Sequence, residues 1–276
     1  MPFTLESLAA LATIVGTIAG VLALIQSSAW LVLISLLFAC LAIIAVLYVR
    51  KQRHTLEAAS IVIEGHSIDS LNIANLRRRV NRTFVLQESR DAVRIAGDDM
   101  EISWTYTGFC KAAREAAIEF SVDSEGGITF DKLNCVAFDL GNDPEMAHAI
   151  QPLRVGTRGI SQKISVPFLK PLVANQPFSV LLKWKLPNCL EPGINYYTST
   201  LSFAQNRVGR CEVRLIFVGT APSWMRVYES TLQKPAALVK TLAPSHQGPG
   251  LCEYLDVVED RPGRSARVYM FWRDAT

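Results

Sequence analysis

Two long stretches without a charged residue at the start of this 276-residue chain constrain its fold more than any other feature. Leu8–Ile25 and Trp30–Val49 contain no Asp, Glu, Lys or Arg. A helix rises about 1.5 Å per residue, so each stretch is long enough to cross a hydrocarbon core of about 30 Å. Only residues 26–29 separate them. The sequence therefore predicts a two-helix transmembrane hairpin over residues 1–49.

The positions of the basic residues predict the orientation of this hairpin. All 28 Lys and Arg lie at or after Arg50, directly behind the second stretch. Basic residues beside a span favour the cytoplasmic side, which predicts a two-pass protein with both termini in the cytoplasm. Residues 1–7 lack the positive charge of a secretory signal. The six cysteines form no C-x-x-C pair, as is typical of a reducing compartment.

Small residues recur every four positions in the first stretch, at Ala12, Gly16 and Gly20. Such spacing lets helix backbones approach closely inside a bilayer. The face can pack against the second helix of the same hairpin or against another protomer. The second possibility predicts a homo-oligomer.

The remainder of the chain is typical of a β-protein. Apolar and polar residues alternate in short runs, for example at Ile102, Trp104 and Tyr106, and turn residues separate the runs. For residues 82–230 we expect an antiparallel β-sandwich or barrel, immunoglobulin-like or lipocalin-like. Residues 50–81 are expected to form a basic juxtamembrane linker or helix, and residues 231–276 a linker followed by a C-terminal β-hairpin around residues 261–263.

A search for catalytic chemistry gives a negative result. The chain has no phosphate-binding glycine loop, no nucleophile elbow and no H-E-x-x-H. Its four histidines are far apart, and none has a partner at zinc-ligand spacing. The sequence therefore predicts no enzyme, no metal and no cofactor, although a site built from distant residues stays open as an alternative.

Arginines on polar segments are the positive candidates for ligand binding, because Arg suits bidentate phosphate contacts. They comprise one run and two pairs that each flank a glycine: Arg77, Arg78, Arg79, Arg154, Arg158, Arg207 and Arg210. The aromatic residues that could stack on bases are Tyr106, Phe109, Tyr196 and Tyr197. The alternatives are contact between residues 77–79 and lipid head groups, and ordinary solvated turns at the two pairs.

This layout resembles the two-transmembrane, β-rich effectors of bacterial antiphage defence, of the cyclic-oligonucleotide-activated (CBASS) or retron-associated kind. The resemblance implies a bacterial inner-membrane protein whose β-domain senses a nucleotide second messenger or a protein or nucleoprotein trigger. The hairpins would then assemble and permeabilise the lipid bilayer, causing abortive infection. The alternative function is a non-toxic membrane-tethered scaffold for protein interaction.

Overall fold

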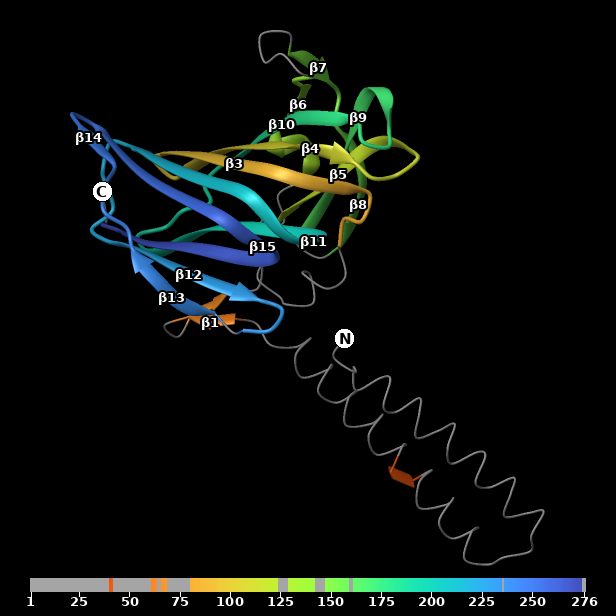
Figure 1. The fold of residues 1–276 in the computed structure, drawn as a ribbon. Coiled ribbons are helices and arrows are strands. Elements are labelled where there is room, and N and C mark those ends of the chain that lie inside the picture. Colours follow the sequence, from red (N-terminus) through yellow and green to blue (C-terminus); the bar gives the residue numbers. More distant parts are fainter. Residues whose placement is uncertain are drawn as a thin grey trace, which may run out of the picture. The chain divides into compact units, whose positions relative to one another are not determined.

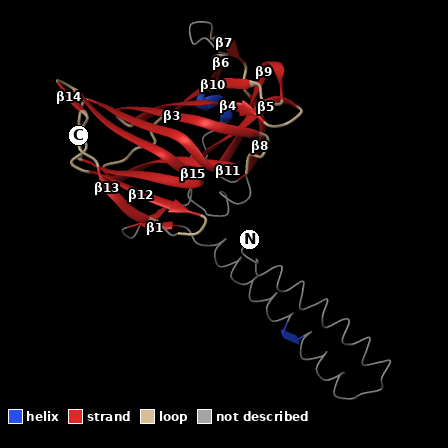
Figure 2. Cartoon of the chain, viewed as in Figure 1, coloured by secondary structure: helices blue, strands red, loops and turns tan. Residues whose placement is uncertain are grey.

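The computed structural model describes residues 40–41, 61–63, 66–68, 80–123, 129–141, 147–158, 161–234 and 236–274. The chain divides into two compact units, residues 1–59 and 60–276. In the first unit, only Cys40 and Leu41 are described, and they are helical and exposed. The second unit is built almost wholly of strands in its described part (Figures 1 and 2).

The membrane hairpin expected over residues 1–49 is corrected by the structure. Among the residues that it describes, no helix has the length and apolar character that a membrane span requires. An apolar composition alone does not make a span, because crossing a bilayer takes a continuous helix of about 20 residues. The predicted two-pass location in the inner membrane is corrected with it. Ala12, Gly16 and Gly20 lie outside the described residues.

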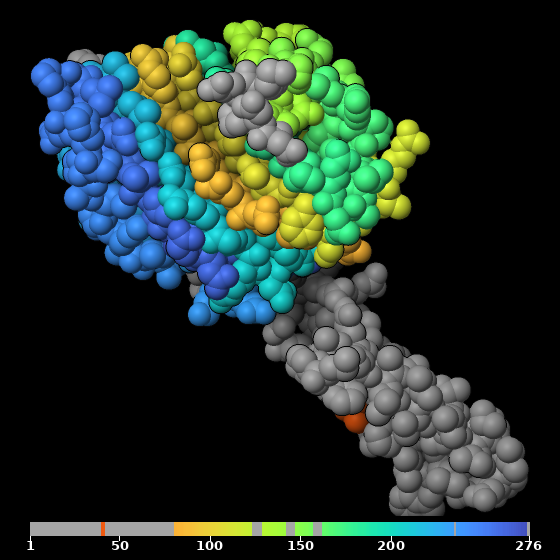
Figure 3. Space-filling view, turned by 45° about the horizontal axis from the view of Figure 1, so that its top comes forward, coloured from red at the N-terminus to blue at the C-terminus, as the bar shows by residue number. Residues whose placement is uncertain are grey.

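Ten of the described strands form one sheet. Nine follow a single path in space, in the order β13 (Ala237–Thr241), β12 (Met225–Thr231), β15 (Leu251–Arg273), β11 (Gly193–Val218), β3 (Phe84–Ala96), β4 (Asp99–Cys110), β10 (Pro177–Leu186), β6 (Val136–Asp139) and β7 (His148–Ile150). The tenth, β14 (His246–Gly248), pairs with β15. Figure 3 shows part of this order on the surface, where the blue C-terminal strands border the teal β11.

A smaller antiparallel sheet consists of β5 (Arg114–Asp123), β9 (Ser161–Val173) and β8 (Leu153–Arg158). It packs on the β3–β4–β10 part of the large sheet through aromatic side chains. The ring centroids of Phe120 on β5 and Tyr106 on β4 are 5.3 Å apart, and those of Phe168 on β9 and Phe178 on β10 are 6.0 Å apart. The two sheets therefore form a sandwich at this end of the domain. A 3-10 helix, η3 (Phe130–Leu133), precedes β6.

The alternation read from the sequence is confirmed by burial. Ile102 and Trp104 on β4, and Val180 and Leu182 on β10, are all buried. Since successive strand side chains point to opposite faces, a period of two identifies the face turned to the core. The prediction of a mainly-β domain holds for this reason.

Several local predictions are wrong. Within the segment expected to be a basic linker or helix, β1 (Ile61–Ile63) and β2 (His66–Ile68) form a two-stranded sheet. The segment expected to be a linker after residue 231 contains β13 and β14. Not every neighbouring pair is antiparallel either, because β11 runs parallel to β3.

The predicted C-terminal hairpin is a single strand of 23 residues, β15, which pairs antiparallel with β11 along its length. The Pro-Gly pair read as a turn lies at an irregularity of this pairing. Ser202 opposes Arg264 and Arg207 opposes Pro262, so residues 203–206 of β11 face Gly263 alone. Proline and glycine are tolerated in strands at such bulges. A long-range partner therefore overrides the local turn preference.

The bulge of β11 is held by the side chain of Gln205. Its Oε1 accepts a hydrogen bond from the Leu86 amide at 2.6 Å, and its Nε2 donates to the carbonyls of Leu86 and Arg207 at 2.5 and 2.7 Å. The side-chain amide thus bonds to β3 where the regular ladder is absent. A Cβ built on Gly263 would collide with the carbonyl oxygen of Gln205. Only glycine fits where β15 passes this bulge.

A buried ion cluster joins β15 to β12 and β13. Asp256 is fully buried and lies 2.6 Å from Lys240 Nζ and 2.8 Å from Arg267 Nη1, while Tyr269 donates a hydrogen bond to it at 2.8 Å. Arg267 also bonds to Glu229 at 2.9 Å. Burial alone would raise the pKa of Asp256, but the bonds from Lys240 and Tyr269 and the charge of Arg267 outweigh it and lower that pKa.

Gly263→Ala should lower the free energy of unfolding by about 2 kcal/mol or more, because the methyl group meets backbone that cannot move without breaking the bulge. Gly156→Ala is the matched control, since a Cβ there meets nothing within 4 Å. Urea unfolding of both variants measures the difference. Equal stability of the two variants would contradict the close approach of β15 to Gln205.

Asp256→Asn should lower the free energy of unfolding at neutral pH by about 2–4 kcal/mol, because it removes the fully buried carboxylate that neutralises the buried Arg267 and leaves that guanidinium with Glu229 alone among the described carboxylates. The pKa of Asp256 is lowered in the folded state, so its contribution is present above the unfolded-state pKa and is lost as the pH falls through the folded-state pKa. Asp260→Asn on the same strand is the control, with a side chain that is 66% exposed. Unfolding curves at neutral and acid pH test this. If both variants lose stability alike, or if Asp256→Asn keeps the full acid sensitivity, the cluster does not have this role.

Candidate binding cavity

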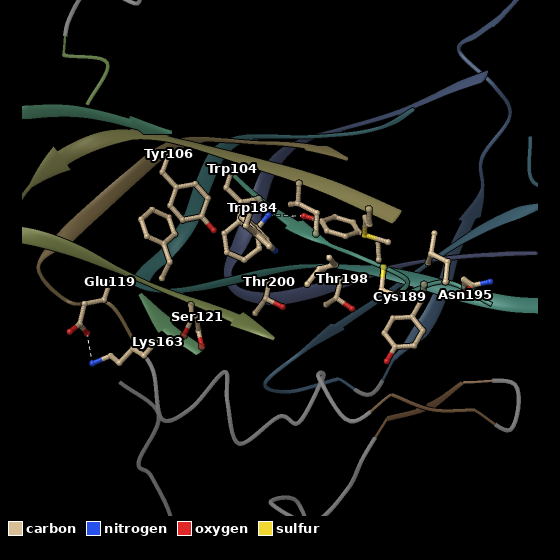
Figure 4. Close-up of a pocket in the computed structure, with 18 of the residues that line it drawn as sticks. Trp104, Tyr106, Glu119, Ser121, Lys163, Trp184, Cys189, Asn195, Thr198 and Thr200 are labelled. Carbon is tan, nitrogen blue, oxygen red and sulfur yellow. Dashed lines mark hydrogen bonds and ion pairs between the residues drawn. The ribbon is translucent and has the colours of Figure 1, made fainter. Parts of the chain in front are cut away.

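A cavity of about 760 Å³ lies where β4, β5, β9 and β10 face the first half of β11. Its lining includes the side chains labelled in Figure 4, which are Trp104, Tyr106, Glu119, Ser121, Lys163, Trp184, Cys189, Asn195, Thr198 and Thr200. Its volume is in the usual range for small-ligand pockets, about 300–1,000 Å³.

The course of β11 creates this space. Beyond the bulge, Arg210–Val218 pairs with β3, whereas among the described strands the part before the bulge pairs only with β15. Near the bulge, the backbone of Asn81 pairs with β11. Its carbonyl accepts a hydrogen bond from the Ala204 amide and its amide donates one to the Ser202 carbonyl, both at 2.8 Å. The part of β11 before the bulge thus borders the cavity with the side chains of both its faces.

Aromatic rings form one wall of the cavity. Trp104 and Tyr106 are two residues apart on β4 and so share a face, and their rings are almost parallel, at 7° with centroids 6.3 Å apart. Trp184 on β10 meets Trp104 edge-on at 77° and 4.4 Å. Figure 4 shows these three rings together, with Thr198 and Thr200 of β11 across from them.

A chain of buried hydrogen bonds fixes the orientation of Trp104. Its Nε1 donates to the Tyr197 hydroxyl at 2.7 Å, and this hydroxyl donates to Asp91 at 3.0 Å. Burial raises the pKa of the Asp91 carboxyl, while a hydrogen bond from Ser199 and the charge of Arg261 act in the opposite direction. The indole is therefore held by a side chain of β11 and, through it, by β3.

Arg261 lies behind this chain and is only 1% exposed. Its guanidinium donates to the Ser199 carbonyl and hydroxyl at 2.6 and 3.1 Å, and to the Ser265 hydroxyl at 2.9 Å. A buried guanidinium needs such partners because its charge has lost water. It belongs to the internal support of the cavity wall.

Two polar atoms of the cavity wall are buried without a hydrogen-bond partner among the described residues. They are Nε1 of Trp184, a residue that is 4% exposed, and Oγ1 of Thr198. An indole N–H can only donate, whereas a threonine hydroxyl can donate or accept. Leaving such a group unpaired costs about 1–3 kcal/mol. Both atoms are enclosed within the wall and are not exposed to the cavity.

An ion pair lies toward one end of the cavity. Lys163 on β9 and Glu119 on β5 form an ion pair at 2.6 Å, with side chains 44% and 49% exposed (Figure 4). Cys189 lies toward the other end, and burial raises the pKa of its thiol to about 11. The thiol is protonated at neutral pH and is a poor nucleophile in that form.

The described lining residues include neither histidine nor aspartate. In the described part of the chain, no three His, Cys, Asp or Glu side chains are grouped so that they could hold a metal ion. The described lining residues therefore include no group of metal ligands and no nucleophile with an adjacent imidazole or aspartate.

Of the arginines predicted to bind phosphate, Arg154, Arg207 and Arg210 have described side chains, and none of these three lines the cavity. Residues 77–79 lie outside the described residues, as does the side chain of Arg158, and Arg154 is exposed on β8. Arg207 and Arg210 lie within β11 rather than in a hairpin turn, and both form surface ion pairs, with Asp260 and Glu88 among their partners. Among the described arginines, Arg154 on β8 lies in the small sheet, whereas Arg207 and Arg210 lie on β11 of the large sheet.

Of the aromatic residues predicted to stack on a ligand, Tyr106, Tyr196 and Tyr197 line the cavity and Phe109 does not. The alternating pattern predicted that Trp104 lies in a strand but gave no sign that it lines a cavity. Thr198 was missed, since a threonine in a strand carries no signal of its own. Recognising the cavity required the folded position of β11, whose Tyr197 bonds to Trp104, 93 positions earlier in the chain.

Comparison with known proteins gives no family. No family model matches the chain, and no curated protein matches it. Solved structures that resemble part of it include a point mutant of an M1 zinc metallopeptidase from Deinococcus radiodurans, with 13% identity over 67% of this chain and a TM-score of 0.40. The unmutated metallopeptidase has 14% identity over 68% of this chain and a TM-score of 0.38. The match spans about 42% of the length of those proteins. A similarity at this level assigns neither family nor activity.

Tyr197→Phe should lower the free energy of unfolding by about 2 kcal/mol, because it leaves both Trp104 Nε1 and Asp91 without their shared partner. Tyr106→Phe is the control on the same wall, since its hydroxyl takes no part in this chain. Thermal and urea unfolding of the two variants measure the difference. A Tyr197 variant no less stable than the Tyr106 variant would show that the chain is energetically unimportant.

Proposed function

We propose that the β-domain is a non-catalytic recognition module that binds a small, uncharged and mainly apolar molecule in the aromatic cavity. The observation that carries the proposal is a cavity of about 760 Å³ in which an aromatic wall of Trp104, Tyr106 and Trp184 faces threonine side chains of β11. Ligand sites typically combine an apolar lining with a few placed polar groups in this way.

The chemistry of the cavity supports binding over catalysis. The Cys189 thiol is protonated at neutral pH, and Glu119 is held in an ion pair with Lys163. Covalent or acid–base catalysis needs an activated nucleophile or a carboxyl or imidazole positioned against the substrate. The described lining residues offer no such pair.

Such a module suits the sensing part of the role that the resemblance to antiphage effectors implies. The antiviral role itself, its nucleotide or protein trigger, and oligomer formation stay predictions. The scaffold alternative also stays open, because a recognition domain can hold a partner as well as sense a signal.

The neutral fluorophore N-phenyl-1-naphthylamine provides a test. The protein should bind it saturably, with a fluorescence increase at a stoichiometry of about one, because the probe is of a size for such a pocket. Thr200→Trp should weaken binding at least 10-fold by filling the cavity, whereas Thr241→Trp on the exposed strand β13 should not. Absence of saturable binding, or equal binding by the two variants, would refute the proposal.

A further inference from the structure

We propose that one end of the sandwich is a docking surface for an acidic protein segment that also carries apolar side chains. This surface, which we call the basic tip, combines four exposed cations with two exposed aliphatic side chains. Its residues are Arg82, Lys111, Arg114, Leu169, Lys170 and Val173. None of them lines the aromatic cavity, so the proposal is independent of the function proposed for that cavity.

Backbone contacts bring the basic tip together from three segments of the chain. The amide of Lys111, just after β4, donates to the Thr83 carbonyl at 2.7 Å, which places it beside Arg82. Arg114 at the start of β5 lies directly opposite Val173 at the end of β9. Figure 1 shows β4, β5 and β9 at this end of the domain. The six residues therefore belong to one region of the surface.

The aliphatic side chains of the tip lie at and beside a bulge in β9. In the pairing of β9 with β5, residues 168–171 face Ala116 alone. Bulges of this kind re-aim side chains away from the regular alternation. Leu169 and Val173 are 55% and 54% exposed, whereas Val166 earlier on the same strand is fully buried. Exposed apolar side chains with a polar rim are typical of interaction surfaces.

The tip carries positive charge only. The segments that form it, residues 82–87, 110–114 and 167–177, contain four cations and no Asp or Glu. No ion pair joins these cations to a described carboxylate, in contrast to Arg90, which pairs with Glu88 at 2.9 Å. Complementary charge steers a partner to such a surface and fixes its register. The tip therefore fits an acidic partner.

Three buried phenylalanine rings fix the segments of the tip relative to one another. The ring centroid of Phe84 on β3 lies 5.8 Å from that of Phe168 on β9 and 5.1 Å from that of Phe178 on β10. A preorganised surface loses little freedom when it binds. Fixed positions of the charges suit a partner whose carboxylates have a definite spacing. This favours a protein segment over the fluid head groups of a lipid surface.

The apolar part of the tip favours a protein over a nucleic acid. Proteins that bind single-stranded nucleic acid stack the bases on aromatic side chains. The exposed apolar side chains of the tip, Leu169 and Val173, are aliphatic instead. They match the apolar side chains of a protein segment that also carries carboxylates.

A fluorescein-labelled peptide, Glu-Glu-Leu-Glu-Glu-Leu-Glu-Glu, is a probe with this chemistry. The full-length protein should bind it saturably in fluorescence anisotropy, and more weakly as salt is raised, because salt screens exposed charges. Arg114→Glu with Lys170→Glu should weaken binding by about 10-fold or more. The matched control, Lys132→Glu with Lys234→Glu, makes the same change of net charge at exposed lysines outside the tip. It should weaken binding by no more than about 3-fold, the long-range effect of net charge.

A second pair of variants tests the apolar contact. Leu169→Ser with Val173→Ser should weaken binding by about 5-fold or more. It should also remove the preference for the probe over a peptide with serine in place of both leucines. Leu238→Ser with Val239→Ser on β13, which changes two aliphatic side chains of similar exposure, should leave binding unchanged. Since every substituted side chain is exposed, all variants should unfold at the urea concentration of the unsubstituted protein.

Weakening confined to the tip variants, with a preference for the leucine peptide, supports the proposal. Absence of saturable binding, or equal weakening by a tip variant and its control, would overturn it. Equal affinity for the leucine and serine peptides would overturn the apolar contact. Tip-dependent binding of phosphatidylglycerol vesicles or of oligodeoxythymidine that is tighter than binding of the peptide would overturn the assignment of a protein partner.

Discussion

The pairing of β11 with β15 is the constraint on which the rest of the described domain depends. It runs from Gly193 to Val218 and is interrupted only where residues 203–206 bulge opposite Gly263. After the bulge β11 joins β3, and before it the strand leaves β3 and borders the cavity. Because β11 pairs with β3 only after the bulge, an opening is left between these two strands before it. Its geometry is stabilised by the Gln205 amide, which bonds to β3 in place of backbone.

The sequence predicted the local pattern of this domain well and its long-range pairing poorly. Alternation identified buried faces such as those of Trp104 and Trp184, because a half-buried strand needs one apolar side whatever its neighbour is. The Pro262-Gly263 pair was read as a turn, since these residues favour turns in isolation. The partner strand, more than 50 residues earlier, decides that they lie in a bulge, and no local signal reveals that. The apolar stretches at the start were read as membrane spans from composition, and the structure corrects this reading.

For the candidate site too, the sequence predicted individual residues better than their arrangement in space. Tyr106 and Tyr197 were predicted to contact a ligand, and both line the cavity. The arginines were chosen for their charge and their neighbouring glycines, but Arg207 and Arg210 are engaged in ion pairs on the surface of a strand. What defines the cavity is the way in which β4, β5, β9 and β10 face the first half of β11. This arrangement brings together segments that are far apart in the sequence, so no local pattern reveals it.

The position of β15 within the large sheet has a consequence for how the chain matures. This strand consists of residues 251–273, yet it lies between β12 and β11, with strands on both sides. During synthesis, β11 lacks its long partner, and Asp91 and Ser199 lack Arg261, until residues 251–273 have left the ribosome. Sheets closed by such distant segments form slowly and expose unpaired strand edges until the missing strand arrives. A nascent chain that has not yet released β15 therefore exposes the edges of β11 and β12 that β15 covers in the folded domain.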